Sequence, residues 1–327
     1  MFNKKCFLIT GGTGSFGHTL VAKLLETDIS RVVIFSRDEA KQHAMQQSMP
    51  DKRLDFILGD IRNLESIKRA IYGVDFVFHA AALKQVPASE NFPMEFIQTN
   101  VHGTHNLLQA LNGSSVTKAI FLSTDKAVYP VNTMGMTKAI MEKLVRSSNY
   151  RFNATACITR YGNVIGSRGS VIPQFIESIK KFGQVNVTDL NMTRFMMSLE
   201  ESVALVLYAL HEGKDGDLFV QKSPAATVKT IVESLSLLLN CSVKIVDIGV
   251  RQGEKIHESL LTSEERNNAL ETEKYFQVRK IGSPKESNVS SRSIISDYTS
   301  FNTQLLTSEQ LADLLSTIPY IQEQLRI

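Results

Sequence analysis

Short apolar runs alternate with longer amphipathic stretches along the first half of the chain. The apolar runs are rich in β-branched and aromatic residues and nearly free of polar interruptions, which is typical of strands buried on both faces of a sheet. Strands are predicted at residues 6–10, 31–35, 54–58, 74–80, 118–123 and 154–159, and helices at 15–27, 62–72, 94–111 and 134–148. Because the two kinds of element alternate, the pattern predicts an α/β fold with a Rossmann-like, doubly wound parallel sheet.

The second half of the chain carries a weaker pattern, which loosens after Gly166. Residues 167–183 predict a loop that leads into a helix, and the amphipathic stretch 198–213 predicts a helix that returns to the first domain. A short strand is expected at 185–189, a final helix at 307–325, and a small second domain from the segments 227–240, 243–249 and 255–265.

These signals together predict two domains and a C-terminal extension. The second domain would be a smaller α/β unit that binds the substrate. The Ser- and Asn-rich stretch 282–302 predicts an irregular arm that could contact a partner. The expected boundaries are 1–166 plus about 195–222 for the first domain, 167–194 plus 223–281 for the second, and 282–327 for the extension.

Composition agrees with a globular protein that buries a core. The chain has 327 residues, of which 43% are hydrophobic and 21% charged, and its net charge is +3. The basic residues are scattered, so we expect an anionic small molecule rather than nucleic acid. Cys6 and Cys157 lie in apolar runs and are interpreted as core residues. We find no metal-ligand spacing, apolar run of 18 residues or long apolar leader, and expect a cytoplasmic protein.

Three glycines separate the first predicted strand from the first predicted helix. Gly11, Gly14 and Gly17 stand in "LITGGTGSFGHTLV". In a dinucleotide-binding turn, one glycine allows a positive φ, the next lets the backbone approach a pyrophosphate, and the third lets helix and strand pack closely. The helix N-terminus then holds the anion. The motif therefore predicts a dinucleotide site at the start of the chain.

The end of the second predicted strand indicates which dinucleotide binds. Arg37 follows the glycines by about twenty residues and would suit a 2′-phosphate, with Lys41 one helical turn later as a second cation. We therefore expect NADP; in the alternative, Asp38 holds the ribose of NAD and Arg37 is a surface residue. Asp60, at the end of the third strand, could accept a hydrogen bond from the adenine amino group.

The stretch "STDKAVYPVNTMGMTK", residues 123–138, contains the spacing of a catalytic Tyr-x-x-x-Lys pair without its tyrosine. Lys138 lies four residues after Met134 and so on the same helix face, but a thioether cannot transfer protons. Met134 is interpreted as a packing residue, and Lys138 as a ligand of the nicotinamide ribose. Tyr129 is an alternative phenol, although it lies in a proline-flanked loop.

Several blocks together carry a family resemblance: "TGGTGSFG", "GDIRN", "HAAALKQVP", "STDKAVYP", "RYGNVIGSRGSVIP", "MTRFMMSLEE" and "RQGEKIHESLL". They resemble the extended short-chain dehydrogenase/reductases that modify nucleotide sugars. The most specific resemblance is to the inverting UDP-N-acetylglucosamine 4,6-dehydratases, in the branch that also epimerises C5 on the way to UDP-N-acetyl-L-fucosamine. That branch serves capsule and O-antigen synthesis, and methionine in the tyrosine position is one of its marks.

The resemblance implies a redox-neutral cycle on UDP-N-acetylglucosamine with tightly bound NADP. Oxidation at the sugar C4 makes the C5 hydrogen acidic, a base removes it, and water leaves from C6. Hydride then returns to C6, and C5 is reprotonated on the opposite face. The resemblance also implies a homo-oligomer, commonly a hexamer, and leaves open whether C3 is epimerised as well.

Asp125 and Lys126 are the expected acid and base, because they stand where the fifth strand ends at the ligand-binding edge of the sheet. Asp125 would protonate the leaving hydroxyl, and Lys126 would act at C5 and could also serve at C4. Neighbouring Lys126 and Lys84 should lower the pKa of Asp125, so it would need a proton from coupled titration or from Lys126. Lys126 is expected to be neutral enough for a base because other cations surround it.

The remaining candidates follow from motif position and from the resemblance. Two arginines suit a diphosphate, a carboxylate suits ribose hydroxyls, and His257 is left without a role. The expected catalytic residues are Thr124, Asp125, Lys126 and Lys138. The expected cofactor-binding residues are Gly11, Thr13, Gly14, Ser15, Phe16, Gly17, Arg37, Lys41, Asp60, Ile61, Ala81, Ala82, Lys84, Thr99, Ser123, Lys138, Tyr161, Asn163 and Val164. The expected substrate-binding residues are Lys84, Asp125, Lys126, Asn163, Ser170, Val171, Arg194, Arg251 and Glu254.

Two other functions fit parts of the sequence. One is another enzyme of this fold, a nucleotide-sugar 4-epimerase or a reductase. The other is an NADP-sensing regulatory protein that has lost its tyrosine and binds partners through residues 282–302. This second alternative leaves the "STDK" block and the arginines of the sugar side unexplained.

Overall fold

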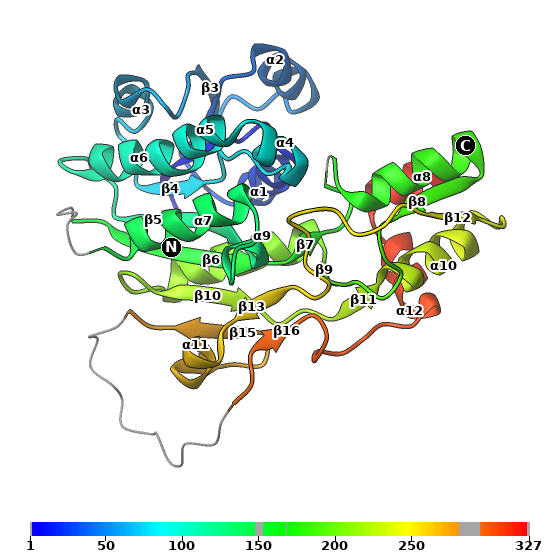
Figure 1. Ribbon diagram of the computed structural model, residues 1–327. Coiled ribbons are helices and arrows are strands. Elements are labelled where there is room, and N and C mark those ends of the chain that lie inside the picture. The colour runs from blue at the N-terminus through cyan, green and yellow to red at the C-terminus, as the bar shows by residue number, and fades with distance from the viewer. Residues whose placement is uncertain (1, 148–152, 168, 281–294, 326–327) are drawn as a thin grey trace.

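A computed structural model describes residues 2–147, 153–167, 169–280 and 295–325 of the chain. Its centre is a nine-stranded sheet in the order β14-β15-β10-β6-β5-β4-β1-β2-β3 (Figure 1). The strands span Cys6–Thr10 (β1), Arg31–Ser36 (β2), Leu54–Leu58 (β3), Phe76–His79 (β4), Lys118–Thr124 (β5), Thr155–Tyr161 (β6), Leu218–Gln221 (β10), Ala269–Glu271 (β14) and Tyr275–Val278 (β15). The six predicted strands are confirmed, each within two residues at either end.

The topology places a crevice at the carboxyl ends of the strands. β1 pairs in parallel with both β2 and β4, so the strand order reverses at β1. β10 continues the parallel sheet beside β6, whereas β15 and β14 run antiparallel at that edge. In such a sheet, ligands bind at the point where the order reverses. The predicted Rossmann-like fold is therefore confirmed, and it fixes where a site is expected.

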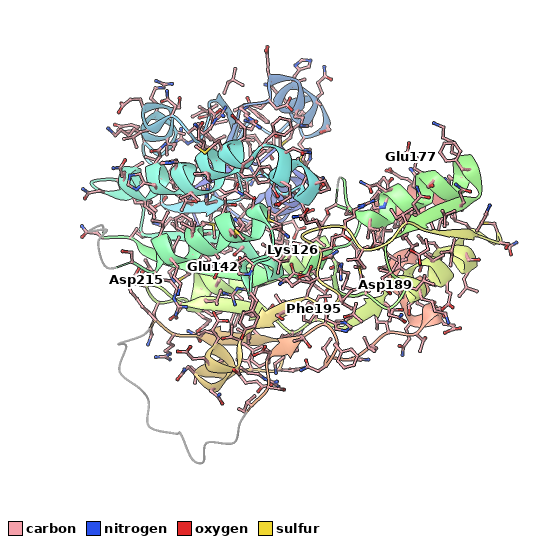
Figure 2. The ribbon with its side chains drawn as sticks, in the orientation of Figure 1. Lys126, Glu142, Glu177, Asp189, Phe195 and Asp215 are labelled. Atoms are coloured by element: carbon pink, nitrogen blue, oxygen red, sulfur yellow. The ribbon has the colours of Figure 1, made fainter. Side chains whose placement is uncertain are left out.

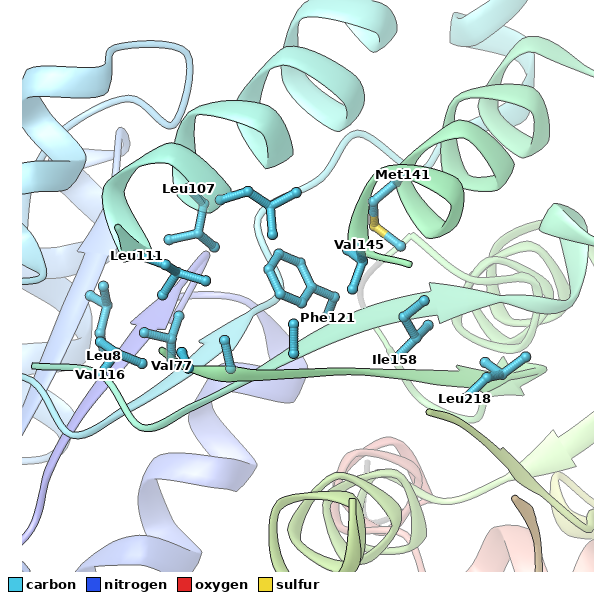
Figure 3. Packing of buried hydrophobic residues seen from close by; sticks show 14 of the residues in the cluster. Leu8, Val77, Leu107, Leu111, Val116, Phe121, Met141, Val145, Ile158 and Leu218 are labelled. Atoms are coloured by element: carbon cyan, nitrogen blue, oxygen red, sulfur yellow. The ribbon is translucent and has the colours of Figure 1, made fainter. Parts of the chain in front are cut away.

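Helices cover both faces of the sheet. α1 (Ser15–Leu25) and α9 (Leu199–Glu212) share one hydrophobic core, so the stretch predicted to return to the first domain does so. α3 (Leu64–Ala70), α6 (Gly103–Leu111) and α7 (Thr133–Val145) cover the other face. Phe121 of β5 lies at the centre of that second core, between α6 and α7 (Figure 3).

Two short helices were not predicted from the sequence. α2 (Glu39–Ser48) buries only Gln42 and Met45, so its sequence carries almost no apolar period. α4 (Val86–Asn91) is six residues long and buries Ser89. Both helices follow strands of the sheet, and neither has the repeated apolar positions by which a helix is recognised from sequence.

The single helix predicted at 94–111 is wrong in detail. The segment divides into α5 (Pro93–Phe96), a π-helical stretch at Ile97–His102, and α6. The π-helical stretch carries Asn100, whose side chain accepts a hydrogen bond from Leu83 N at 2.9 Å and donates to Leu83 O at 3.0 Å. The wider turn thus holds the loop after β4, which borders the crevice.

A second region with its own core lies beside the sheet, where α8, α10 and α12 gather in Figure 1. Small sheets join it to the main body. Its helices and strands are β7 (Asn163–Val164), α8 (Val171–Phe182), β8 (Gln184–Val187), β9 (Thr193–Met197), β11 (Ala225–Thr227), α10 (Val228–Leu238), β12 (Lys244–Asp247), α12 (Ser308–Ser316) and α13 (Pro319–Leu325). The final helix predicted at 307–325 is interrupted before Pro319, which cannot continue a helix that precedes it.

The structure pairs segments across the expected domain boundaries. Residues 269–278, assigned to the second domain from the sequence, extend the main sheet as β14 and β15. α12 and α13, assigned to the extension, pack into the core of the second region. β13 (Ser259–Leu261) pairs with β16 (Tyr298–Thr299), and α11 (Ser263–Asn267) follows β13. Most of the predicted arm at 282–302 lies outside the described residues.

The described residues also bear on the cysteines and on membrane insertion. Cys6 and Cys157 are buried, which confirms their interpretation as core residues, and Cys241 is exposed. Among the residues that the structure describes, none of the helices has the length and hydrophobicity needed to span a bilayer.

Replacing Phe121 by alanine should destabilise the protein by about 3–5 kcal/mol, because a fully buried aromatic ring leaves a cavity. Phe182 is 65% exposed, so Phe182→Ala should change the free energy of unfolding by less than about 1 kcal/mol. Urea denaturation of both variants tests this difference. Equal losses in the two variants would contradict the assignment of Phe121 to the core.

Candidate active site

A cleft of about 900 Å³ opens along the carboxyl ends of β1, β2, β4, β5 and β6 and extends toward the second region. Every predicted site residue lines it except Asp125, which is fully buried behind the wall. Lys126 lies where the sheet and the second region meet (Figure 2). The sequence motifs, which are scattered over more than 200 residues, are thus brought to one surface.

The glycine loop has the close approaches that its sequence predicts. Gly11 has a φ of +69°, and a Cβ on it would lie 2.8 Å from Ala81 N in the loop after β4. A Cβ on Gly17 would lie 2.1 Å from Gly12 O, so α1 packs directly on the loop. Gly14 precedes α1, whose N-terminus therefore meets the cleft as an anion-binding end of the helix.

The two residues that follow β2 have different roles: Asp38 caps a helix, and Arg37 is a cation that lines the cleft. Asp38 caps α2, because its Oδ1 accepts a hydrogen bond from Lys41 N at 3.0 Å, and its Oδ2 lies 2.6 Å from Lys41 Nζ. Arg37 is exposed and lines the cleft. Asp60 is held by Arg62, whose Nη2 donates to Asp60 Oδ2 at 2.7 Å. These contacts occupy Asp38 with the helix and leave Arg37 facing the cofactor end of the cleft.

Lys138 is buried on α7, four residues after Met134. Its Nζ donates to Leu122 O at 2.6 Å and to Met141 Sδ at 3.1 Å. Burial lowers the pKa of Lys138 to about 8, although the nearby Glu142 carboxylate acts in the opposite direction. Met134 is 4% exposed and lines the cleft, so the thioether packs where the phenol of a Tyr-x-x-x-Lys pair would stand.

A buried ionic network fixes α7 against the sheet. Arg160 of β6 donates to both carboxylate oxygens of Glu142, at 3.0 and 2.5 Å, and to Glu265 of α11 at 2.9 Å. Ser123, at the end of β5, donates to Glu142 Oε1 at 2.5 Å. Because bidentate pairs fix orientation as well as distance, the network holds the helix of Lys138 in register with the end of β5.

Lys126 lies between two buried carboxylates. Its Nζ is 3.0 Å from Asp125 Oδ1 and 3.2 Å from Glu258 Oε1. Thr124 Oγ1, which faces the cleft, donates to the same Asp125 oxygen at 2.9 Å. Asp125 Oδ2 is buried without a hydrogen-bond partner. The Lys126 ammonium and the Thr124 hydroxyl therefore form the connection between Asp125 and the cleft.

The structure corrects two expectations about charge at this site. Burial raises the pKa of Asp125 and Glu258 raises it further, and together they outweigh Lys126, so this pKa is raised rather than lowered as predicted. Burial alone would lower the pKa of Lys126, but Asp125 and Glu258 raise it above the ordinary value. The prediction that cations surround Lys126 is wrong, because its nearest charged neighbours are carboxylates.

The substrate-side candidates meet beside Lys126. Arg194 of β9 is anchored through donors to Thr193 O and Ile256 O at 2.8 and 3.1 Å. Arg251 and Glu254 lie 3.7 Å apart and, with Ser170, Val171 and Asn163, line the same cleft. A side cavity of about 110 Å³ opens here and is lined by Lys126, Arg194, Glu254, Lys255 and Glu258 among others.

Two aromatic candidates lie elsewhere. Tyr129 is exposed, and its hydroxyl points toward Asp297 Oδ1 at 3.5 Å, so it does not line the cleft. His257 shares a short contact of 2.8 Å with Thr193 Oγ1 and packs against the ring of Phe301. Both side chains have neighbours that explain them as structural residues.

Glu258 is the main site residue that the sequence analysis missed. Glu258 follows His257 in the "EKIHE" segment, which is part of a quoted motif. Its contact with Lys126, at 3.2 Å, appears only in the structure. The far end of the cleft was also missed, since its residues come from helices and strands with no motif. They are Phe175, Asn186, Val187, Val228 and Ile231.

Comparisons with known proteins agree with this architecture. Residues 7–280 match the family described as polysaccharide biosynthesis protein. The chain is 47% identical to a UDP-glucose 4-epimerase of Rickettsia rickettsii, over 100% of this chain and 99% of that protein. The crystal structure of Pen from Bacillus thuringiensis has a TM-score of 0.91 and 34% identity, with 99% of both chains covered. A dTDP-glucose 4,6-dehydratase of Streptomyces venezuelae, with a TM-score of 0.70 and 24% identity over 77% of this chain and 86% of its own, shares the fold.

Lys138→Met should remove a pH-dependent part of the stability. Folded Lys138 has a pKa of about 8, whereas an unfolded lysine keeps its proton to about pH 10.4. Between these values the unfolded chain binds more protons, so the stability of the wild type relative to Lys138→Met should rise with pH, by up to about 1.4 kcal/mol per unit. Denaturation across this range measures it, with the exposed Lys143→Met as control. A difference independent of pH would contradict the buried lysine.

Proposed function

We propose that this chain, which belongs to the polysaccharide biosynthesis protein family, is a UDP-N-acetylglucosamine 4,6-dehydratase that also inverts C5. The observation that carries the proposal is the pair formed by Asp125 and Lys126 at the end of β5. An acid and an amine 3.0 Å apart, beside a dinucleotide cleft, are what an elimination next to a ketone requires. A 4-epimerase needs neither a base at C5 nor an acid at C6.

The cleft fits NADP as the cofactor. The glycine loop leaves room for a pyrophosphate, Arg37 suits a 2′-phosphate, and Lys138 lines the cleft where it could bind the nicotinamide ribose. When bound, the cofactor would take a hydride from C4 of the sugar and return it at C6. NAD is the alternative, and the related fold from Streptomyces venezuelae was solved with NAD.

The chain's own residues handle the protons. Lys126 would take the proton from C5 in its neutral form and, as an ammonium, return one to the opposite face of C5, which requires the planar intermediate to turn over in the site between the two transfers. Asp125, whose raised pKa favours the acid, would protonate the hydroxyl that leaves C6. Because Asp125 does not line the cleft, its proton would pass through Thr124 Oγ1 or Lys126 Nζ, the two donors that contact Asp125 Oδ1.

Proton balance gives the C4 hydroxyl a defined destination. Loss of one water removes the C6 hydroxyl and, in sum, the proton of the C4 hydroxyl. The proton that Asp125 gives up is therefore replaced by the one released at C4. The hydrogen bond between Thr124 and Asp125 supplies a route for this transfer without a phenol at position 134. Arg194 and Arg251 would bind the diphosphate, and Glu254 the ribose.

The alternative with specific support is a 4-epimerase, because relatives with 46–47% identity carry that name. Mass spectrometry of UDP-N-acetylglucosamine after incubation with the enzyme separates the possibilities. A dehydratase gives a product lighter by one water with no net change in NADPH absorbance. An isomer of unchanged mass would support the epimerase, NADPH consumption a reductase, and cofactor binding without turnover a regulatory protein.

Lys126→Ala should abolish loss of water from the sugar, since no other amine lies within bonding distance of Asp125 in the described site. Thermal denaturation would show that the variant is folded.

Met134→Tyr should leave the fold intact and change the rate little, because protons already reach Asp125 through Thr124. Normal dehydration by Lys126→Ala, or a large rate gain in Met134→Tyr, would contradict these roles.

Arg37→Ala should weaken NADP binding by about tenfold or more, roughly 1.4 kcal/mol. The guanidinium is proposed to contact a group that NAD lacks, so affinity for NAD should remain nearly the same. Titration calorimetry with both cofactors measures the two changes in one variant. Equal losses for NADP and NAD would show that Arg37 does not select the 2′-phosphate.

A further inference from the structure

Glu258 occupies an unusual position for a carboxylate. Its residue is 3% exposed, its Oε1 lies 3.2 Å from Lys126 Nζ, and its Oε2 lies 3.3 Å from Lys255 Nζ without forming a hydrogen bond. A buried carboxylate is costly unless nearby charges stabilise it. The cations that surround Glu258 provide that stabilisation, and Lys126 is the one that belongs to the proposed catalytic pair.

The backbone around Glu258 is held from two sides. Glu258 N donates to Ser300 Oγ at 2.9 Å, and Ser300 N donates to Glu258 O at 2.8 Å. Ser300 in turn bonds to Thr193, the residue before Arg194 in β9. The position of the carboxylate is therefore set by the junction of three chain segments rather than by a single flexible loop.

The Glu258 side chain also borders the side cavity of about 110 Å³ next to the cleft. Glu254 Oε2 and Glu258 Oε2 are buried there without hydrogen-bond partners. The cavity has room for several waters, since one water occupies about 30 Å³ in the liquid.

We propose that Glu258 is a positioning residue, which holds the Lys126 ammonium beside the sugar site and sets the pH range in which this lysine works. The proposal rests on the proposed function for its catalytic meaning. Asp125 is not the lasting charged partner of Lys126 in this proposal, because Asp125 is itself the proposed acid and its pKa is raised. Glu258 is then the permanent anion of the group.

The charged groups around Lys126 support the assignment of Asp125 as the acid and of Glu258 as the lasting anion. Asp125 lies on the same turn, Glu258 precedes β13, and Arg194 approaches from β9 with Lys255 beside Glu258. Burial would raise the pKa of Glu258, but Lys126, Arg194 and Lys255 lower it and keep the carboxylate ionised. An ionised Glu258 favours the ammonium of Lys126, so the lysine becomes a base only at a higher pH than it would alone.

The first test needs no substrate. Acetylation of Lys126 by acetic anhydride at increasing pH, followed by mass spectrometry, reports the midpoint at which the free amine forms. In Glu258→Gln, which keeps the shape and removes the charge, the midpoint should fall by about one pH unit or more. In Glu258→Asp, which keeps the charge, the midpoint should stay close to that of the wild type. An unchanged midpoint in Glu258→Gln would overturn the proposal.

A matched control is Glu271, in β14 at the edge of the main sheet. Lys222 and Glu271 form an ion pair of 2.7 Å in which Glu271 is largely exposed. Glu271→Gln should leave the Lys126 midpoint unchanged. A shift of the Lys126 midpoint in this control would mean that the labelling reports general loss of negative charge, and would overturn the assignment to Glu258.

The second test uses turnover and separates this inference from the proposed function. If the wild type dehydrates UDP-N-acetylglucosamine, the limb of the kcat profile that rises with pH should move to lower pH in Glu258→Gln, in step with the labelling midpoint. A kcat profile that does not move would overturn the proposal. If the wild type does not dehydrate this sugar, the proposed function fails, while the labelling result still decides whether Glu258 controls Lys126.

Discussion

A lysine held between two buried carboxylates is the interaction on which the rest of this site depends. Lys126 lies 3.0 Å from Asp125 and 3.2 Å from Glu258, and both carboxylates are buried while Lys126 lines the cleft. Burial and the neighbouring carboxylate raise the pKa of Asp125, whereas Lys126, Arg194 and Lys255 lower that of Glu258. Burial and mutual charge therefore divide the roles: Asp125 can supply a proton, Glu258 remains an anion, and Lys126 lies between them.

The fold makes this arrangement possible by ending its parallel strands at one edge. β5 delivers Thr124 and its neighbours, β6 and α7 are tied together by Arg160 and Glu142, and the segment before β13 brings Glu258 from the other side. The methionine in the tyrosine position is then no defect in the site. With a threonine hydroxyl bonded to a buried carboxyl, the proton transfers of the proposed reaction would take place at the end of β5 rather than on α7.

The sequence was sufficient to predict the parts of the protein that have a strong hydrophobic pattern or a recognisable turn motif. Buried strands, the glycine loop and the segment from Thr124 to Lys138 all have local signals, and they led to the sheet and to the part of the cleft that lies along its carboxyl edge. Local signals do not show how deeply a side chain is buried or which charges distant parts of the chain bring beside it. The expected charge around Lys126 was therefore wrong, and Glu258, more than 130 positions away, was missed. Helices with one or two buried residues, such as α2, were missed because their apolar period is too weak.

The central claim is that Lys126 and its carboxylates exchange the proton at C5 of a nucleotide sugar. The most direct measurement is the NMR spectrum of the product that the wild-type enzyme forms from UDP-N-acetylglucosamine in D2O. The account predicts a 4-keto, 6-deoxy sugar with deuterium at C5 and inverted configuration at that carbon. A product that keeps its original hydrogen and configuration at C5 would contradict it.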